Sequence, residues 1–559
     1  MSAGKETARW KAGREPIALA VTPDGKQLVA ANALPEDPMS AHNSNTRNRV
    51  RIFETSSGAV TVIPLFIGSM NARDLAITPD GRYAFVSCLI GHFDQIPMSI
   101  AGGWICENLL AAVDLETKTF ADTIYLDEAS HGAANPWGIS ISPDARFLAV
   151  AHAGTDEISL VNLPRIIRQL DARASKTQRG LGQYLALMPH YSDSNASQSN
   201  DFESMTPVHV RIPLGVKGMR RIVIDDRRRI FCTAAYEDLI GRIDFKIAEP
   251  IQNAFNYPTD FGESAKPKHV LPLQKIVDLP PTQKKSYVVE PMNNLPYQSE
   301  NNSQSVKMFR FTFERLEPLQ PYSGFSVERS IARLGPPPIW NIVRRGEALF
   351  HDGTYCEQQW LSCASCHPDG RSDAINWDLL NDGMNNPKNT KSLLLSHKTP
   401  PCMASGVREN AEIAVRAGVH SILFSRFPIE NDYCAIDEYL KSMQPTLSPQ
   451  LVNGQFSESA RRGKLLFNDA RTGCSHCHPE PYYTDLDQHN VGTREYDSWN
   501  EYDTPSLVEV WRTAPYLHDG RYATIKELLV EGKHFAPDNR LEKLSEQEID
   551  DLVEFVLSL

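Results

Sequence analysis

The sequence lacks any run that approaches 18 consecutive apolar residues, so it predicts no transmembrane helix. It also lacks an excess of positive charge. The chain has 57 Lys and Arg against 69 Asp and Glu, a net charge of −12, which gives a nucleic-acid-binding role no support. An acidic surface serves solubility, and it can also attract a basic redox partner. Cysteine and histidine are scarce, at 10 and 16 of 559 residues, so any clustering of the two is informative.

They cluster twice in the same pattern. Cys363-Ala364-Ser365-Cys366-His367 and Cys474-Ser475-His476-Cys477-His478 both read C-x-x-C-H, the pattern for covalent attachment of c-type haem. The two thiols would reach the two vinyl groups of one porphyrin, and the histidine would be the proximal iron ligand. A zinc knuckle and a redox dithiol are the alternatives, and neither explains a histidine at the same place twice. We therefore predict two covalently attached haem c groups, with His367 and His478 as iron ligands.

The opening residues, Met1–Glu6, have no apolar stretch of the kind found in a secretory signal. Covalent c-type haem, by contrast, is normally attached outside the cytoplasmic membrane. We therefore expect that a leader has been removed and that the protein works in the periplasm or an equivalent compartment. Such a compartment permits disulfides among the six other cysteines, although their pairing cannot be read from the sequence.

The carboxy-terminal half is duplicated. Arg344–Asp352, with R-G-x-x-L-F, recurs as Arg461–Asp469, and the two haem motifs follow at an offset of 111 residues. Further matched phrases lie 114 to 116 residues apart. Each copy ends in a predicted amphipathic helix, Asp432–Met443 and Ser545–Leu559, and the second has a capping box at Ser545 and Glu548. Residues 340–448 and 455–559 are thus predicted to be two small, mostly helical haem domains.

The duplication also nominates second axial ligands. His420 and His534 lie at equivalent positions, 53 and 56 residues after their proximal histidines. His534 is the stronger candidate, and His420 is as readily a surface histidine. His518 has Ala404 as its counterpart, so it is predicted to order a loop rather than to bind iron.

The amino-terminal half repeats a different phrase. Val21–Gly25, Ile77–Gly81 and Ile141–Ala145 each combine Ser or Thr with Pro-Asp, and a degenerate fourth copy is Val223–Arg227. Each predicts a strand, a tight turn and a second strand. Further strands are predicted to follow: Arg49–Phe53, Leu109–Leu115, Glu157–Leu163 and Leu239–Phe245.

This rhythm is typical of β-propeller blades and resembles the YVTN-type propellers. The fold class is therefore multidomain: an all-β propeller over 1–330, then two cytochrome c-like haem domains. Four blades are visible and more could lie within 246–325. Residues 165–201 are predicted to form a partly helical surface insertion, and Leu334–Pro338 a stiff linker. An irregular β-sandwich is the alternative to the propeller.

The haem half resembles the dihaem cytochrome c peroxidase family, including the related enzyme that matures the tryptophylquinone of methylamine dehydrogenase. The resemblance rests on the two C-x-x-C-H motifs, R-G-x-x-L-F before each, Asn389–Leu393 as N-T-x-S-L, and Thr513–Gly520 as T-A-P-Y-x-H-D-G. It implies a peroxidatic first haem and a second haem that relays electrons, with His534 as the distal ligand of the relay. It also implies a calcium ion between the haems, for which Asn389 and Thr504 are candidate ligands.

The sequence departs from the family at two places. Ala404 stands where relatives often carry a tryptophan, which puts electron passage between the haems in doubt by that route; Trp511 could substitute. The acidic distal residue of the family has no clean match, and His420 and Glu430 are the nearest candidates, with His397 behind them.

The leading hypothesis is therefore a peroxidase-type oxidoreductase. Peroxide binds the open iron of the first haem, a distal His420 or Glu430 moves the proton, and a small redox protein exchanges electrons through the second haem. One alternative is a non-catalytic electron-transfer or assembly protein with two bis-histidine haems. Another places the substrate on the propeller, with the dihaem half as a remote oxidant. The oligomeric state, homo- or hetero-oligomeric, is left open.

Overall fold

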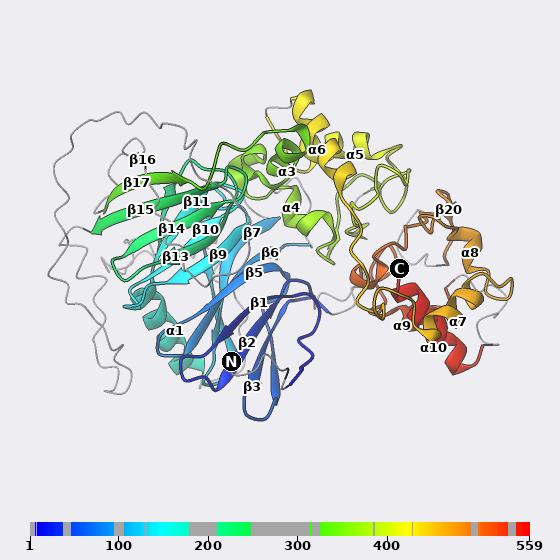
Figure 1. Cartoon of the computed structure of the whole chain (residues 1–559), viewed down its shortest axis with the longest axis horizontal. Coiled ribbons are helices and arrows are strands. Elements are labelled where there is room, and N and C mark those ends of the chain that lie inside the picture. The colour runs from blue at the N-terminus through cyan, green and yellow to red at the C-terminus, as the bar shows by residue number, and fades with distance from the viewer. Residues whose placement is uncertain are drawn as a thin grey trace, which may run out of the picture.

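The computed structural model describes residues 6, 8–36, 46–93, 105–128, 131–177, 209–247, 314–315, 325–383, 386–426, 429–492, 501–534 and 544–559. The amino-terminal half of the chain forms antiparallel sheets, and the carboxy-terminal half forms helices (Figure 1). The chain is therefore multidomain, with its strands and helices segregated along the sequence.

Four sheets make up the strand-rich half, and in each of them the strands pair mostly in chain order. The sheets have the orders β1-β2-β3-β4, β5-β6-β7-β8, β12-β11-β10-β9 and β13-β14-β15-β17-β16. The strands are β1 Pro16–Val21, β2 Gln27–Asn32, β3 Arg49–Glu54, β4 Val60–Pro64, β5 Ser69–Ile77, β6 Tyr83–Gly91, β7 Cys106–Asp114, β8 Thr119–Tyr125, β9 Pro136–Ile141, β10 Phe147–His152, β11 Glu157–Asn162, β12 His209–Pro213, β13 Met219–Ile224, β14 Arg229–Ala234, β15 Leu239–Ile247, β16 Glu314–Arg315 and β17 Phe325–Arg333.

The repeated phrase forms the first hairpin of each sheet, as the sequence predicted. In the first sheet the Thr22 hydroxyl donates to Asp24 Oδ1 at 2.7 Å, and Gly25 takes a φ of 74°. Gly81 and Ala145 hold the same place in the next two hairpins, with φ of 79° and 55°. The left-handed turn costs glycine little and strains alanine, so the third copy keeps the turn at a small conformational cost.

The sheets lie face to face in sequence order. The first strand of each contacts the first strand of the next, in the pairs β1 with β5, β5 with β9 and β9 with β13. Apolar side chains fill the spaces between sheets, for example Val50 and Ile52 against Leu109 and Val113. Helix α1 (Leu163–Thr177) follows β11 and contacts β8 and β10; the rest of the predicted insertion and most of 246–325 lie outside the described residues.

Two helix pairs form the frames of the duplicated copies, α3 with α6 and α7 with α10. Gly346 and Gly463 hold the helices close: a Cβ on either would lie within 2 Å of the carbonyl oxygen of Ala435 or Asp551. The helices are α3 Ile342–His351, α4 Cys363–Cys366, α5 Ala411–Ser421, α6 Glu430–Ser442, α7 Glu458–Phe467, α8 Cys474–Cys477, α9 Ile525–Val530 and α10 Glu546–Leu557.

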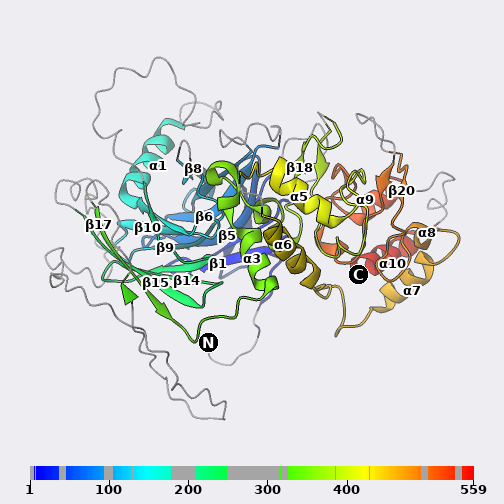
Figure 2. The ribbon, with the colours of Figure 1, turned by 90° about the horizontal axis from the view of Figure 1, so that it is seen from above.

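The predicted closing helices are confirmed as α6 and α10, and the capping box at Ser545 and Glu548 is present. The first copy lies between the sheets and the second copy in both views (Figures 1 and 2). Among the described residues, no helix is long and apolar enough to cross a bilayer.

Candidate functional site

Each copy encloses a cavity at its C-x-x-C-H motif. In the first copy the motif forms α4, and Cys363, Cys366 and His367 all line the cavity. Helix α5 supplies an apolar side of it. The residues of α5 that line the cavity are Ala411, Ala414, Val415 and Gly418, followed by Ile422 and Leu423 just beyond the helix.

His367 is held in the orientation that a proximal ligand needs. Its Nδ1 donates to the carbonyl of Arg371 at 3.1 Å, which leaves Nε2 as the unprotonated nitrogen. Burial lowers the pKa of His367 to about 4, so the ring is neutral at pH 7, the form that binds a metal. Two thiols beside such an imidazole in an apolar cavity fit the porphyrin that the motif predicts.

The second cavity repeats this arrangement and adds a second histidine. His478 Nδ1 donates to the carbonyl of Tyr483 at 2.8 Å, and Cys474 and Cys477 line the same cavity. His534 lines it as well. Burial, together with the nearby His478, lowers the pKa of His534 to about 4. The structure thus brings His478 and His534 together, whereas His367 is the one histidine among the described residues that line the first cavity.

The two cavities adjoin. Residues 389–392, Thr399 and Ala404 line both of them. The Asn389 N–H donates to the His518 carbonyl at 2.6 Å, so the loop of the second copy touches this shared wall. The His518 ring stacks on Tyr502, with centroids 3.7 Å apart and an interplanar angle of 9°. His518 therefore orders a loop, as predicted, and it also forms an aromatic stack at the boundary between the cavities.

The structure places His420 and Glu430 away from the first cavity. His420 is exposed in the last turn of α5, while the cavity-lining residues of that helix lie on another face. Glu430 begins α6 with a side chain that is 63% exposed, and it pairs with Arg416. Neither residue is among those that line the cavity.

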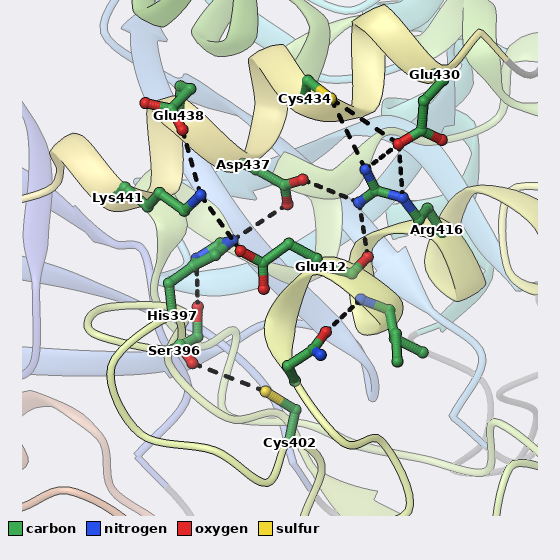
Figure 3. A network of polar contacts seen from close by, with 12 residues as sticks. Ser396, His397, Cys402, Glu412, Arg416, Glu430, Cys434, Asp437, Glu438 and Lys441 are labelled. Atoms are coloured by element: carbon green, nitrogen blue, oxygen red, sulfur yellow. Dashed lines mark hydrogen bonds and ion pairs between the residues drawn. The ribbon is translucent and has the colours of Figure 1, made fainter.

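A different polar chain starts at the cavity (Figure 3). Ser396 lines the cavity, and its hydroxyl lies 3.4 Å from His397 Nδ1, a long hydrogen bond. His397 Nε2 bonds to Asp437 Oδ1 at 3.1 Å, and Asp437 Oδ2 accepts from Arg416 at 2.9 Å. Burial opposes ionisation of Asp437, but the bonds from His397 and Arg416 outweigh it and lower its pKa. The side chains of His397 and Asp437 are each 4% exposed.

The two calcium candidates lie on the boundary between the copies. Asn389 lines both cavities, and its amide nitrogen donates to Asn376 Oδ1 at 3.0 Å. Thr504 lines the second cavity, and its side chain bonds to Asp485. The described residues that could together hold an ion are Cys477, Asp485 and His489, a set that includes a thiol expected to carry haem.

Sequence reasoning missed several polar residues of the first cavity. Asp382, Lys388, Ser396 and Ser405 line it together with Met403. Asp382 pairs with Lys388 and accepts from the Ser405 hydroxyl. Ser396 lies three residues after the N-T-x-S-L motif and directly before His397, so its closeness to the motif was the one available signal.

No protein-family model matches the sequence. The hydrazine synthase subunit gamma of Kuenenia stuttgartiensis is 26% identical, and the match covers 39% of this chain and 77% of that protein. The methylamine utilization protein MauG of Methylophilus methylotrophus is also 26% identical, over 43% of this chain and 89% of its own.

Among solved structures, a MauG-like protein associated with microbial copper homeostasis is 23% identical, with a TM-score of 0.31. The match covers 40% of this chain and 90% of the MauG-like protein. A solved diheme peroxidase from Burkholderia thailandensis is 16% identical, with a TM-score of 0.31, over 38% of this chain and 84% of its own. Over about two fifths of its length the chain is thus similar to hydrazine synthase subunit gamma and to MauG, which supports its resemblance to the dihaem cytochrome c peroxidase family.

Proposed function

We propose that this protein is a dihaem c-type oxidoreductase in which the first site reacts with peroxide and the second relays electrons. The observation that carries the proposal is the difference between the two cavities. Each holds a C-x-x-C-H motif, but only the second has further histidines among its described lining residues: His489, His518 and His534. His489 pairs with Asp485 and His518 stacks on Tyr502, which leaves His534 as the candidate second iron ligand. His534 as a second ligand would close the second iron, whereas the described lining of the first cavity offers no second histidine to close the first.

The residues present fit two covalently bound haem groups. Cys363 and Cys366, and likewise Cys474 and Cys477, would form the thioethers, and His367 and His478 would hold the iron. Bound there, the haem supplies the oxidation chemistry. Burial lowers the pKa of both imidazoles and keeps them neutral, and their bonds to the Arg371 and Tyr483 carbonyls orient them.

His397 takes the proton-handling role that the sequence assigned to His420 or Glu430. It is buried, and it reaches the first cavity through the Ser396 hydroxyl. With Asp437 bonded to Nε2, Ser396 can pass its proton to His397 Nδ1 as its oxygen accepts a proton from a substrate in the cavity, and the proton returns by the same route. The ionised Asp437 stabilises the imidazolium between these two steps.

Electrons would cross the wall that the two cavities share. Ala404 contributes no aromatic ring to this wall, and the Tyr502–His518 stack stands beside it in the second copy. A small redox protein outside the cytoplasmic membrane would deliver the electrons, and a basic partner suits the net charge of −12.

The four sheets are proposed to be blades of a β-propeller. The support is that the first strands of successive sheets lie next to one another, which is the arrangement of inner strands around a propeller axis. Calcium between the haems, with Asn389 and Thr504 as ligands, remains a proposal. Exhaustive treatment with EGTA, followed by metal analysis and reconstitution, tests it directly.

Spin-state spectroscopy of the isolated protein tests the proposed function. One high-spin and one low-spin haem are expected, and cyanide or peroxide should perturb the high-spin signal alone. Two low-spin, unreactive haems would instead support the electron-transfer protein. Reaction at the haem that depends on a ligand bound to the sheets would support the remote-oxidant hypothesis.

A further inference from the structure

Residues of the sheet domain form hydrogen bonds to the first haem motif, which lies in another domain. Asn135, which directly precedes β9, is 4% exposed, and both ends of its side-chain amide bond to residues of the α4 cap. Its Nδ2 donates to Ser362 Oγ at 2.8 Å, and its Oδ1 accepts from the Ser365 hydroxyl at 2.7 Å. These two serines form the capping box of α4, the helix that carries Cys363 and Cys366.

In this contact every hydrogen-bond donor faces an acceptor. Ser362 Oγ accepts from Asn135 and from the Ala364 N–H, whereas Ser365 Oγ accepts from the Ser362 N–H and donates to Asn135. In this orientation the Asn135 amide uses its donor on one serine and its acceptor on the other. The contact is therefore specific to the residues on both sides of it.

Two more buried asparagines act beside it. Asn71, on β5, donates to the Ala364 carbonyl at 3.3 Å. Asn108, on β7, donates to the Trp360 carbonyl at 3.0 Å and accepts from the Asn135 N–H at 3.0 Å. Residues on β5 and β7 and the residue before β9, from two neighbouring sheets, thus bond to the motif and to the segment that leads into it.

The other side of His367 is held as well. Arg73, also on β5, pairs with Asp369 at 3.1 Å, two residues beyond the histidine. The Arg73 side chain is 4% exposed and stacks on Trp137 of β9, with its guanidinium carbon 4.2 Å from the ring centroid. The backbone before and after His367 is therefore anchored to the sheets.

The second motif is built differently. The residue that precedes α8 is Gly473, and no side chain caps that helix. The described contacts of the sheet half with the second copy include those of Arg14 and Glu15 with Arg512, outside the second motif. The duplicated motifs therefore differ in what supports them.

We propose that the sheet domain sets the position of the proximal histidine of the first haem, with Asn135 as the positioning residue. The proposal rests on the proposed haem function and goes beyond it, because it gives the sheets a role at one haem and not at the other. Groups that orient a metal-binding imidazole also set its basicity and thereby the properties of the metal. A substitution in the sheets that moves α4 would then alter the midpoint potential and the ligand affinity of the first haem.

The test uses full-length holoprotein with Asn135→Leu, which keeps the branched shape of the side chain and removes the hydrogen bonds of its amide, including a long one to the His351 carbonyl. Asn162→Leu is the matched control, because Asn162 is also a buried asparagine of the sheets and accepts from the Arg165 N–H at 3.1 Å. The midpoint potentials of both haems and the cyanide affinity of the first are measured. With Asn135→Leu, the first potential should shift and the cyanide Kd should change on the order of tenfold, while the second potential stays at its wild-type value. The control should change neither.

Unchanged first-haem values in a folded Asn135→Leu protein would overturn the proposal, and so would equal shifts at both haems. If that variant does not fold, Ser365→Ala removes one of the two bonds from the haem side, together with the Ser365 bond to the Ser362 N–H, and the same outcomes decide. A pyridine haemochrome assay separates the two levels of the argument. Absence of haem from the wild-type protein refutes the proposed function, whereas haem that is present but insensitive to Asn135 refutes this inference alone.

Discussion

The two copies of the haem-type domain share their frame and differ at the side of the cavity away from the motif. In both, a glycine of the opening helix lets the closing helix approach, and an arginine beside it pairs with an aspartate: Arg345 with Asp432, and Arg462 with Asp551. In the first copy an apolar face of α5 lines the cavity, and in the second His534 enters it. The helix packing is thus alike in the two copies, whereas the lining of the two cavities differs. Under the proposed function, this difference lets one chain combine a reactive site with a relay.

The largest effect should come from removing the attachment cysteines of one copy at a time. Cys363→Ser with Cys366→Ser, and separately Cys474→Ser with Cys477→Ser, should each lower the covalent haem content from two per chain to one. The first pair should also abolish the reaction with peroxide, because it removes the open site. Intact mass and haem absorbance measure both. An unchanged haem content in either variant would show that its cysteine pair does not attach a haem.

The next largest effect should come from His534→Ala. Loss of this histidine should convert the second haem from low-spin to high-spin and let it bind cyanide, so that the second cavity behaves like the first. Electron paramagnetic resonance measures the change. His518→Ala is the matched control, since His518 lines the same cavity but stacks on Tyr502. A low-spin second haem in His534→Ala would show that another residue is its ligand.

His397→Gln should slow the first site without changing its spin state. If His397 handles the proton through Ser396, the second-order rate with peroxide should fall on the order of a hundredfold, the usual contribution of a general acid–base group. Stopped-flow absorbance measures the rate, and cyanide binding to the same variant shows whether the cavity is intact. His489→Gln is a control in the second copy, where His489 pairs with Asp485 at 2.7 Å. A rate within twofold of wild type would exclude His397 from the reaction.

A smaller effect is expected on stability from Asp551→Asn in the frame of the second copy. Hydrogen bonds from Arg462, Ser459 and Gln547 lower the pKa of Asp551 to about 2. Because its folded pKa lies below its unfolded value, Asp551 stabilises the fold above about pH 4, and this contribution is lost as the pH falls toward 2. The exposed Arg462 reduces the gain, so the variant should lose about 1–2 kcal/mol at pH 7.

Urea unfolding at pH 7 and pH 3 measures this loss, and the difference from wild type should shrink at the lower pH. Asp550→Asn is the control, because its partner Lys526 and its own side chain are both about half exposed. An equal loss of unfolding free energy in the two variants would mean that the buried Asp551 does not stabilise the α7–α10 pair.

The repeated phrases predicted most of the elements. Turn residues such as Thr22 and Asp24 act through local hydrogen bonds, and the capping box at Ser545 is local as well, so both can be read from sequence. The attachment motifs are equally local. The hydrogen bonds of Asn135 to Ser362 and Ser365 join residues that are 227 and 230 positions apart in the sequence, and no local pattern predicts them.

The equivalence of His420 and His534 failed as a guide to geometry because the chain around them differs. In the first copy Ala411, Ala414, Val415 and Gly418 face the cavity with helical spacing, and two residues further along a helix turns a side chain by about 200°. His420 therefore leaves the cavity. In the second copy α9 ends at Val530, and His534 enters from the turn that follows.

His420→Ala should accordingly have the smallest effect of all. The side chain is exposed, so its removal should leave the first haem high-spin and change the peroxide rate by less than about twofold, as is usual for a surface position. Glu430→Gln should do the same, since Glu430 pairs with Arg416 outside the cavity. Both variants are compared with wild type by electron paramagnetic resonance and stopped flow. A new open coordination position in His420→Ala would mean that the histidine swings in to bind iron when haem is present. In that case the two copies would be alike, and the protein would carry electrons without reacting with peroxide.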